Sequence, residues 1–187
     1  MIAVWIFIGV IVILIVTFVA IYNGLVRSRN QVKNAWAQID VQLKRRHDLI
    51  PNLMETVKGY MKHERETLEA VTKARTLAQQ VASASPGERG KVEGELSSAL
   101  TRLLAVAERY PDLKASQNFL ALQEELASTE NKISFSRQFY NDAVLTYNNQ
   151  TQMFPSNIVA GMAGFKAGEF FEVTIAAEKE APKVSFT

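Results

Sequence analysis

The chain has 187 residues and a net charge of +2, and 48% of its residues are hydrophobic. This length accommodates one membrane segment and one domain, and the nearly balanced charge gives no reason to expect a nucleic acid as a partner. The chain contains no cysteine, which excludes disulfides, thiolate metal sites and a thiol nucleophile.

Residues 2–22 form an uncharged apolar run, IAVWIFIGVIVILIVTFVAIY. As a helix, this run would span roughly 30 Å, which is the thickness of a bilayer's hydrocarbon core. A signal peptide would instead carry basic residues before a shorter apolar run and small residues at a cleavage site after it. We therefore predict an uncleaved single-pass anchor over residues 1–26.

Basic residues are concentrated just after this anchor. Residues 23–62 contain eight Lys/Arg and three Asp/Glu. The positive-inside rule then predicts that the N-terminus lies outside and the domain lies in the cytoplasm. Because anionic headgroups attract such residues, we expect membrane lipids as partners of a membrane-surface set. This set consists of Arg27, Arg29, Lys33, Lys44 and Arg45.

After the anchor, apolar residues recur at alternating spacings of three and four, which is typical of helices that pack on other helices in coiled coils and bundles. The first such stripe predicts one helix over residues 31–82. It consists of Val32, Trp36, Ile39, Leu43, Ile50, Leu53, Val57, Tyr60, Val71, Ala74, Ala78 and Val81.

Helix-start signals divide the rest of the chain. Ser85 as N-cap, Pro86 in the first turn and Glu88 three residues after the cap predict a second helix. A third helix is expected over about 113–152, with Asp112 as its N-cap. A short fourth helix follows FPSN, capped by Ser156 or Asn157.

These elements predict an all-α fold. The N-terminal transmembrane helix continues into a long antiparallel helical bundle over residues 27–166, with three long helices and a short fourth. Residues 167–187 are expected to form a polar, partly extended tail, whose start is anchored by Phe170 and Phe171.

The segment RRHDLIPNL, residues 45–53, combines charged residues with a proline. The heptad register places Arg46 on the inner seam, where a charge is costly unless it is paired, so we predict a carboxylate partner, either Glu130 or Asp48. Pro51 is expected to kink the helix without ending it. We predict that a wider set of residues forms either a structural polar layer that fixes helix register or a groove for a partner. This set is Arg46, Asp48, Pro51, Glu130, Asn131, Asn141 and Asn148.

The sequence gives little support to a catalytic function. A hydrolase would have to use His47, Asp48 and Glu130, but a single histidine on a helix flank is usually just part of the surface. HERE, residues 63–66, resembles the zincin motif but lacks its second histidine. We therefore predict no catalytic, cofactor-binding or metal-binding residue.

The expected helix lengths do not balance, because the second helix is too short to cover the first. If the connections are short, one apolar stripe stays uncovered near the membrane. A longer connection could instead let the third helix run back along the first. We favour covering by another copy, since an exposed stripe of this size is unusual in a monomer. The candidate assembly stripe is Trp36, Ile39, Leu43, Ile50 and Leu53.

Two long segments resemble the LemA family: NAWAQIDVQLKRRHDLIPNLMETVKGYMKHE and YPDLKASQNFLALQEELASTENKISFSRQFYNDAVLTYNNQTQMFPSNIVA. The resemblance covers essentially the whole chain, to the final PKVSF. It implies a bacterial cytoplasmic membrane protein with one N-terminal helix, a helical domain and no known enzymatic activity. Members of this family are often encoded near membrane proteases, so the resemblance also implies a membrane protease as a possible partner. One relative in the family takes part in shaping the magnetosome membrane.

The residues and the resemblance together favour a membrane-anchored, non-enzymatic scaffold. It would self-associate into a homo-oligomer or organise membrane protein partners. An alternative is an adaptor that presents clients to a membrane protease or chaperone through the bundle groove or the C-terminal tail. Deletion of residues 178–187 would test the role of the tail.

Overall fold

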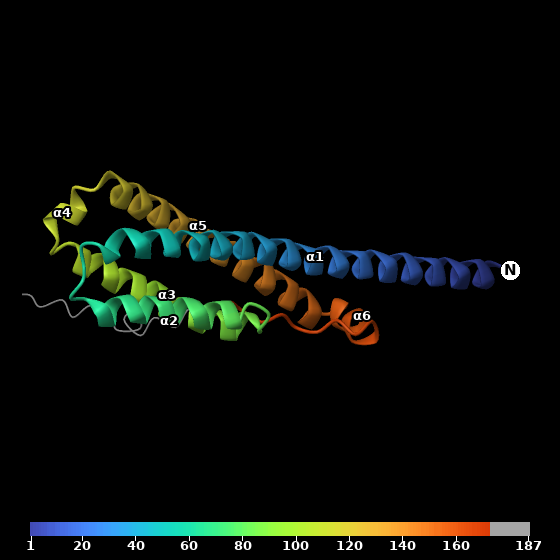
Figure 1. Cartoon of the computed structure of the whole chain (residues 1–187). Coiled ribbons are helices and arrows are strands. Elements are labelled where there is room, and N and C mark those ends of the chain that lie inside the picture. The colour runs from blue at the N-terminus through green and yellow to red at the C-terminus, as the bar shows by residue number, and fades with distance from the viewer. Residues whose placement is uncertain (173–187) are drawn as a thin grey trace, which may run out of the picture. The chain divides into compact units, whose positions relative to one another are not determined.

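The computed structural model describes residues 1–172. Within this range the chain is helical and contains no strand, which confirms the all-α class. The helices are α1 (Ile2–Lys58), α2 (Arg65–Gln80), α3 (Pro86–Ala107), α4 (Pro111–Lys114), α5 (Gln117–Gln152) and α6 (Ser156–Met162). Figure 1 shows their order along the chain.

The chain divides into two compact units. Unit 1 comprises residues 1–39 and 136–168, and unit 2 comprises residues 40–135 and the segment that begins at Glu169. Both α1 and α5 therefore contribute to each unit. The expected division into an anchor, a bundle from residue 27 and a tail from residue 167 remains a prediction.

The N-terminal part of α1 is the candidate membrane span of the described residues. Its side chains from Ile2 to Ala20 are exposed and uncharged. A helix suits such a segment because it satisfies every backbone hydrogen bond internally, as a hydrocarbon environment requires. The α1 helix then continues through Pro51, so the proline does not end it, as predicted, while the kink expected there remains a prediction.

The predicted helix over residues 31–82 is wrong at its middle. The α1 helix ends at Lys58, and α2 starts only at Arg65. Gly59 follows the last residue of α1, and glycine disfavours helix by about 1 kcal/mol relative to alanine. In the turn, Met61 donates its N–H to the carbonyl of Val57 and buries its side chain, whereas Tyr60 of the predicted stripe is exposed.

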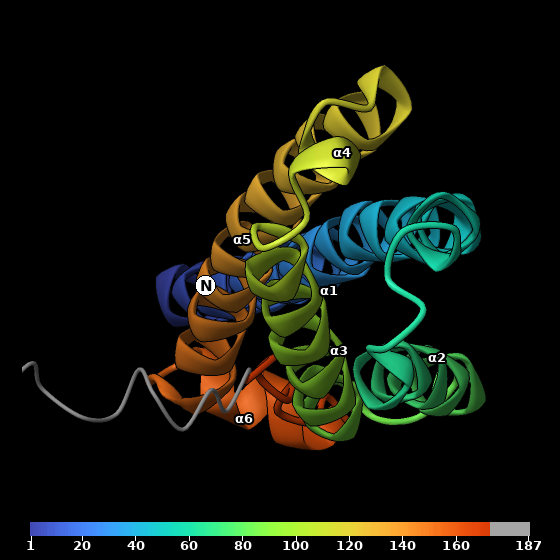
Figure 2. The ribbon, with the colours of Figure 1, turned by 60° about the vertical axis from the view of Figure 1, so that its left-hand side comes forward.

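The hydrophobic core of unit 2 lies among α1, α2, α3, α4 and the start of α5. It contains Leu53 and Val57 of α1, Val71 of α2, Leu96 and Leu103 of α3, and Phe119 of α5, together with others. Figures 1 and 2 show α2 and α3 side by side within this unit. The short α4 buries Leu113 in the same core and connects α3 to α5.

Helix starts follow the expected signals in only one of three cases. The α3 helix begins at Pro86, and the Ser85 hydroxyl accepts a hydrogen bond from the Glu88 N–H at 3.5 Å, as predicted. Asp112 lies inside α4, so it does not cap the long third helix, which begins at Gln117. The residue before α6 is Pro155, and the Ser156 hydroxyl donates instead to the carbonyls of Gln150 and Met153.

The predicted uncovered stripe is also wrong. Ile39, Leu43, Ile50 and Leu53 are buried, and Trp36 is half-buried with its ring centroid 5.2 Å from that of Tyr140 in unit 1. In unit 2, Ile50 and Leu53 pack in the same core as Leu126 of α5. The chain itself therefore covers the stripe, and the inference of self-association loses its support.

The described part of the predicted tail from Glu169 belongs to unit 2. Phe171 is buried, whereas Phe170 is partly exposed. The backbone of Glu172 approaches α3 so closely that a Cβ atom on Gly90 would lie 2.4 Å from its carbonyl oxygen. Residues 173–187 of the expected tail lie outside the described residues.

Candidate functional site: a buried ion network

Four charged or titratable side chains are buried together in unit 2. Arg46 and His47 come from α1, and Arg89 and Glu93 come from α3. Arg46 is 1% exposed and Glu93 is 2% exposed, which is rare for ionisable residues unless they are paired. We call these residues and the side chains that pair with them the ion network.

Arg46 is the centre of the ion network. Its Nη2 atom forms an ion pair with Glu93 Oε2 and also donates to the Glu93 backbone carbonyl at 3.3 Å. Its Nη1 atom donates to both carboxylate oxygens of Glu130 on α5, at 3.0 and 2.8 Å. The predicted pairing of Arg46 with Glu130 is therefore confirmed, and one side chain links α1, α3 and α5.

Ser97 closes a triangle with these residues. Its hydroxyl accepts a hydrogen bond from Arg46 Nη1 at 2.6 Å and donates one to Glu130 Oε1 at 2.6 Å. The hydroxyl proton of Ser97 is therefore committed to a carboxylate that also binds an arginine. This arrangement is suited to holding α3 and α5 in register and does not generate a nucleophile.

The second half of the ion network surrounds Arg89. Arg89 Nη2 donates to Asp40 Oδ1 at 2.6 Å, and its Nη1 donates to the carbonyl of Ala82 at 3.1 Å. Its Nε lies 4.0 Å from Glu93 Oε1. Both buried arginines therefore face Glu93, while the partly exposed carboxylates of Glu130 and Asp40 supply the remaining negative charge.

His47 joins the ion network through Glu93. His47 Nε2 lies 3.3 Å from Glu93 Oε2, and the His47 carbonyl accepts a hydrogen bond from Arg75 Nε of α2 at 3.0 Å. Burial raises the pKa of Glu93, but the hydrogen bond from His47 and the charge of Arg46 outweigh burial and hold that pKa below its ordinary value of 4.5. Glu93 is therefore ionised at neutral pH.

The other residues of the predicted polar layer are not brought to the ion network. Asp48, Pro51 and Asn131 are exposed. Asn148 lies in unit 1, where its Nδ2 donates to the Gly168 carbonyl at 3.0 Å and its Oδ1 accepts from the Gly168 N–H at 2.7 Å. Asn141 is half-buried in the same unit and has an interaction of its own.

The residues of the predicted membrane-surface set are exposed, but not all of them are free. Arg45 forms an ion pair with Glu125 in unit 2. In unit 1, the Arg29 guanidinium carbon lies 5.0 Å from the centroid of the Phe165 ring. Arg27, Lys33 and Lys44 are exposed as well. Their contact with lipid remains a prediction.

The weaker catalytic alternative is not assembled. His47 is buried against Glu93, Asp48 is exposed, and Glu130 is held by Arg46 and Ser97. Within residues 1–172, no group of three or more His, Asp or Glu side chains is placed to hold a metal ion. Sequence reasoning missed four residues of the ion network: Asp40, Arg89, Glu93 and Ser97.

Comparisons with known proteins agree with this helical architecture. The model of the LemA family matches residues 35–186 of the chain. The chain is 30% identical over 161 residues to Protein LemA of Metamycoplasma hominis, covering 82% of this chain and 72% of that protein. It is 25% identical over 186 residues to Magnetosome protein MamQ 2 of Paramagnetospirillum magneticum, covering 87% and 68%.

A third relative is Magnetosome protein MamQ of Magnetospirillum gryphiswaldense. It is 23% identical over 181 residues, covering 84% of this chain and 66% of the relative. None of these names states an enzymatic activity. The apolar N-terminal part of α1 and the magnetosome relatives together indicate a membrane-associated protein. The match over residues 35–186 shows that the chain belongs to the LemA family.

Proposed function

We propose that the protein is a membrane-anchored, non-enzymatic scaffold that holds a partner protein at the bacterial cytoplasmic membrane. One observation carries this proposal: unit 2 has a groove with a basic rim between the end of α1 and the start of α2. The groove has a volume of about 560 Å³. Its lining residues are Met54, Lys58, Met61, Lys62, Arg65, Leu68, Glu69, Thr72 and Lys73.

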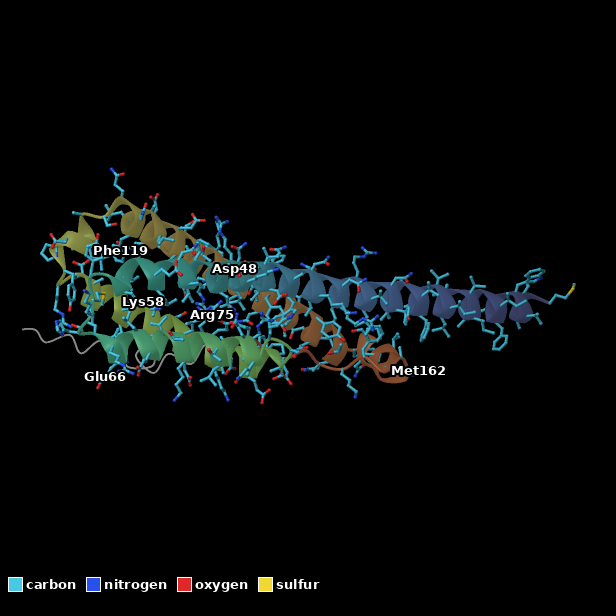
Figure 3. The ribbon with its side chains drawn as sticks, viewed as in Figure 1. Asp48, Lys58, Glu66, Arg75, Phe119 and Met162 are labelled. Carbon is cyan, nitrogen blue, oxygen red and sulfur yellow. The ribbon has the colours of Figure 1, made fainter. Side chains whose placement is uncertain are left out.

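One face of α2, the end of α1 and the turn between them build the groove. Positions 65, 68, 69, 72 and 73 share one face of α2, positions 54 and 58 lie one helical turn apart on α1, and positions 61 and 62 lie in the turn. Figure 3 labels Lys58 at the end of α1 and Glu66 in the first turn of α2, which mark this end of the unit. Two helices with facing sides are a frame on which a third helix can pack.

The chemistry of the lining indicates the occupant. The apolar part of the lining is Leu68, which is partly buried, together with Met54 and Met61, whose side chains are themselves buried in the core. Four cationic side chains and a single carboxylate, Glu69, line the same groove. Glu69 already accepts a hydrogen bond from Arg65 at 2.6 Å, so the rim as a whole is positive. The groove suits an amphipathic helix with an apolar stripe and acidic flanks.

The ion network supports this proposal because it links the helices that frame unit 2. Arg46 links α1 to α3 and α5, and Arg75 links α2 to the backbone of α1. A groove built on helices whose positions are fixed loses less entropy when it binds a partner. The network therefore has a positioning role for the groove.

Site-specific photo-crosslinking in membranes tests the proposal. A crosslinking residue at Thr72, which lines the groove, is compared with one at Gln79, which is exposed on α2 but does not line it. We expect an adduct at position 72 and none at position 79. The crosslinked segment, mapped by mass spectrometry, should be acidic with apolar residues at helical spacing.

The charge of the rim provides the control. Lys58→Glu with Lys62→Glu should remove the adduct at position 72 while the helix content stays unchanged. Equal adducts at both positions, a basic mapped segment, or adducts with lipid alone would contradict the proposal.

A second candidate function is an adaptor that presents clients to a membrane protease or chaperone through the C-terminal tail. The favouring observation is the contact between Gly90 of α3 and the backbone of Glu172, which ties the start of the tail to unit 2. Residues 178–187 come after this contact in the chain, so their deletion leaves it in place. The deletion should abolish capture of the crosslinked partner without lowering the stability of unit 2, and unchanged capture would reject the adaptor.

A further inference from the structure

Unit 1 exposes a cluster of large apolar side chains around α6. The exposed fractions are 54% for Ile158, 63% for Met153, 75% for Met162 and 80% for Phe154. We call these four residues the α6 patch. The four residues lie within ten consecutive positions, and Ile158 and Met162, four residues apart on α6, share one face of that helix.

The α6 helix packs against α1 where the apolar run of the anchor ends. Val159 and Ala160 of α6 are buried together with Leu25 of α1, and Ile21 and Phe165 pack against them. The ring centroid of Phe165 lies 5.8 Å from that of Tyr22 in an edge-to-face arrangement. Since the uncharged run ends at Tyr22, these contacts place α6 beside the last turns of the predicted span.

Charge is absent from the segment that carries the α6 patch. Residues 143–165 contain no Asp, Glu, Lys or Arg, and the next residue is Lys166. Arg27 and Arg29 of α1 follow the anchor, and Arg29 lies over the Phe165 ring. An apolar segment with cations at its border matches the boundary between acyl chains and anionic headgroups.

The α6 patch also continues an apolar surface that is already on α1. The side chains of the anchor are exposed up to Ala20, and Ile21 contacts the α6 cluster. Figure 3 shows Met162 at the end of α6, within the same unit as the anchor. A bilayer that surrounds the anchor would therefore reach this neighbouring surface as well.

We propose that the α6 patch inserts into the interfacial layer of the bilayer next to the anchor, as a second membrane contact. The occupant is lipid at the boundary of acyl chains and headgroups. This inference rests on the membrane anchoring in the proposed function but not on the groove. It gives the domain two lipid contacts, so that unit 1 is restrained against rotation about the anchor.

Spin labelling tests the inference directly, because the chain has no cysteine of its own. Phe154→Cys and Met162→Cys, each in the full-length chain, are labelled with a nitroxide in phosphatidylethanolamine–phosphatidylglycerol vesicles. Val16→Cys in the anchor is the lipid reference, and Phe135→Cys, an exposed aromatic position in unit 2, is the matched control. Collision with oxygen and with a water-soluble nickel chelate is measured for each label.

We expect the ratio of oxygen to nickel accessibility at positions 154 and 162 to shift toward the value at position 16, while position 135 stays nickel-accessible. Ratios at 154 and 162 equal to that at 135 would overturn the inference while leaving the anchor intact. A nickel-accessible label at position 16 would overturn the membrane anchor as well. Dipolar broadening between labels at position 162 would identify a second copy, and not lipid, as the occupant.

Discussion

Buried charges in unit 2 connect individual residues to the register of the helices. A desolvated ion pair contributes little net stability by itself, because removing two charges from water costs about as much as their attraction returns. Removing one partner, however, leaves an unpaired buried charge. Arg46 has Glu93, Glu130 and Ser97 as partners, so any shift of α1 along α3 or α5 would break these contacts.

Arg46→Met should therefore destabilise the protein by about 3–5 kcal/mol, since it leaves Glu93 buried beside fewer partners. Denaturation in urea, monitored by circular dichroism, measures this change. Lys44→Met is the matched control on the same helix, because Lys44 is exposed, and its effect should stay within about 0.5 kcal/mol. Equal stability of the wild type and Arg46→Met would show that the network does not hold the helices.

The pH dependence of stability should follow Glu93. Burial raises the pKa of this carboxyl, but the contacts with His47 and Arg46 lower it by more than burial raises it. The pKa of Glu93 in the folded state is therefore below 4.5. A depressed folded pKa contributes stability above the unfolded pKa, and this contribution is lost as the pH falls through the folded value.

The free energy of unfolding should therefore decline below about pH 4.5, the ordinary value for this group. Glu93→Gln should be less stable at pH 7 and should show a shallower decline in the acid range. Urea titrations at pH 7 and in steps below pH 5 measure both slopes. Parallel pH profiles for the two proteins would exclude Glu93 as a source of the acid sensitivity.

Sequence reasoning located Arg46 but missed its most buried partner. The heptad register of α1 places Arg46 between buried Leu43 and Ile50, so its burial was predictable. Glu93 lies next to Val92, which packs partly buried against the core, and a glutamate beside an apolar residue on a helix is usually exposed to solvent. Its burial depends on two arginines, Arg46 and Arg89, which are far from each other in the chain.

At the scale of elements, the turn between α1 and α2 shows the limit of apolar periodicity. Val57, Tyr60 and Val71 share one helical register, although Glu64 and Thr67 occupy the register positions between them, and this shared register alone favours one helix. Gly59 lowers the helical preference locally, and the packing of α2 on α3 then stabilises the turn in which the chain reverses direction. The helix over about 113–152, in contrast, was correctly predicted as one long helix apart from its start, and α5 buries Phe119, Leu126, Ile133, Tyr140 and Val144 along its length.

Burial of the apolar stripe of α1 predicts how a substitution in this stripe affects stability and assembly. Leu43→Ala should lower the free energy of unfolding by about 2–5 kcal/mol, because Leu43 is fully buried within the chain. The mass of the full-length protein in mild detergent, measured by light scattering, should stay unchanged. A fall in mass for Leu43→Ala without loss of stability would restore the stripe as an assembly surface.

The close approach of Glu172 to α3 makes another prediction. A Cβ atom on Gly90 would meet the Glu172 carbonyl oxygen at 2.4 Å and its carbonyl carbon at 3.0 Å, so Gly90→Ala must displace residues 169–172. Hydrogen exchange of this segment should accelerate. Gly87→Ala is the control, because its nearest contact would be an ordinary 3.9 Å. Unchanged exchange in Gly90→Ala would show that the segment is not held against α3.

At the scale of the molecule, each unit carries a distinct surface. Unit 1 contains the apolar part of α1 and the α6 patch, both suited to lipid, and unit 2 contains the ion network and the groove with its basic rim. Composition and periodicity predicted the anchor and the helical class. They could not predict the groove, because the end of α1 and one face of α2 come together only through the turn at residues 59–64, which itself contributes Met61 and Lys62 to the lining.

The most direct test of the scaffold proposal is a charge exchange between the groove and the partner segment identified by crosslinking at Thr72. Lys58→Glu with Lys62→Glu should abolish the adduct, and replacing acidic residues of the mapped partner segment by lysine should restore it. Restoration would show that opposite charges meet in the groove. If the adduct survives the first exchange, or if the second fails to restore it in folded partners, the groove is not the docking site and the proposal is wrong.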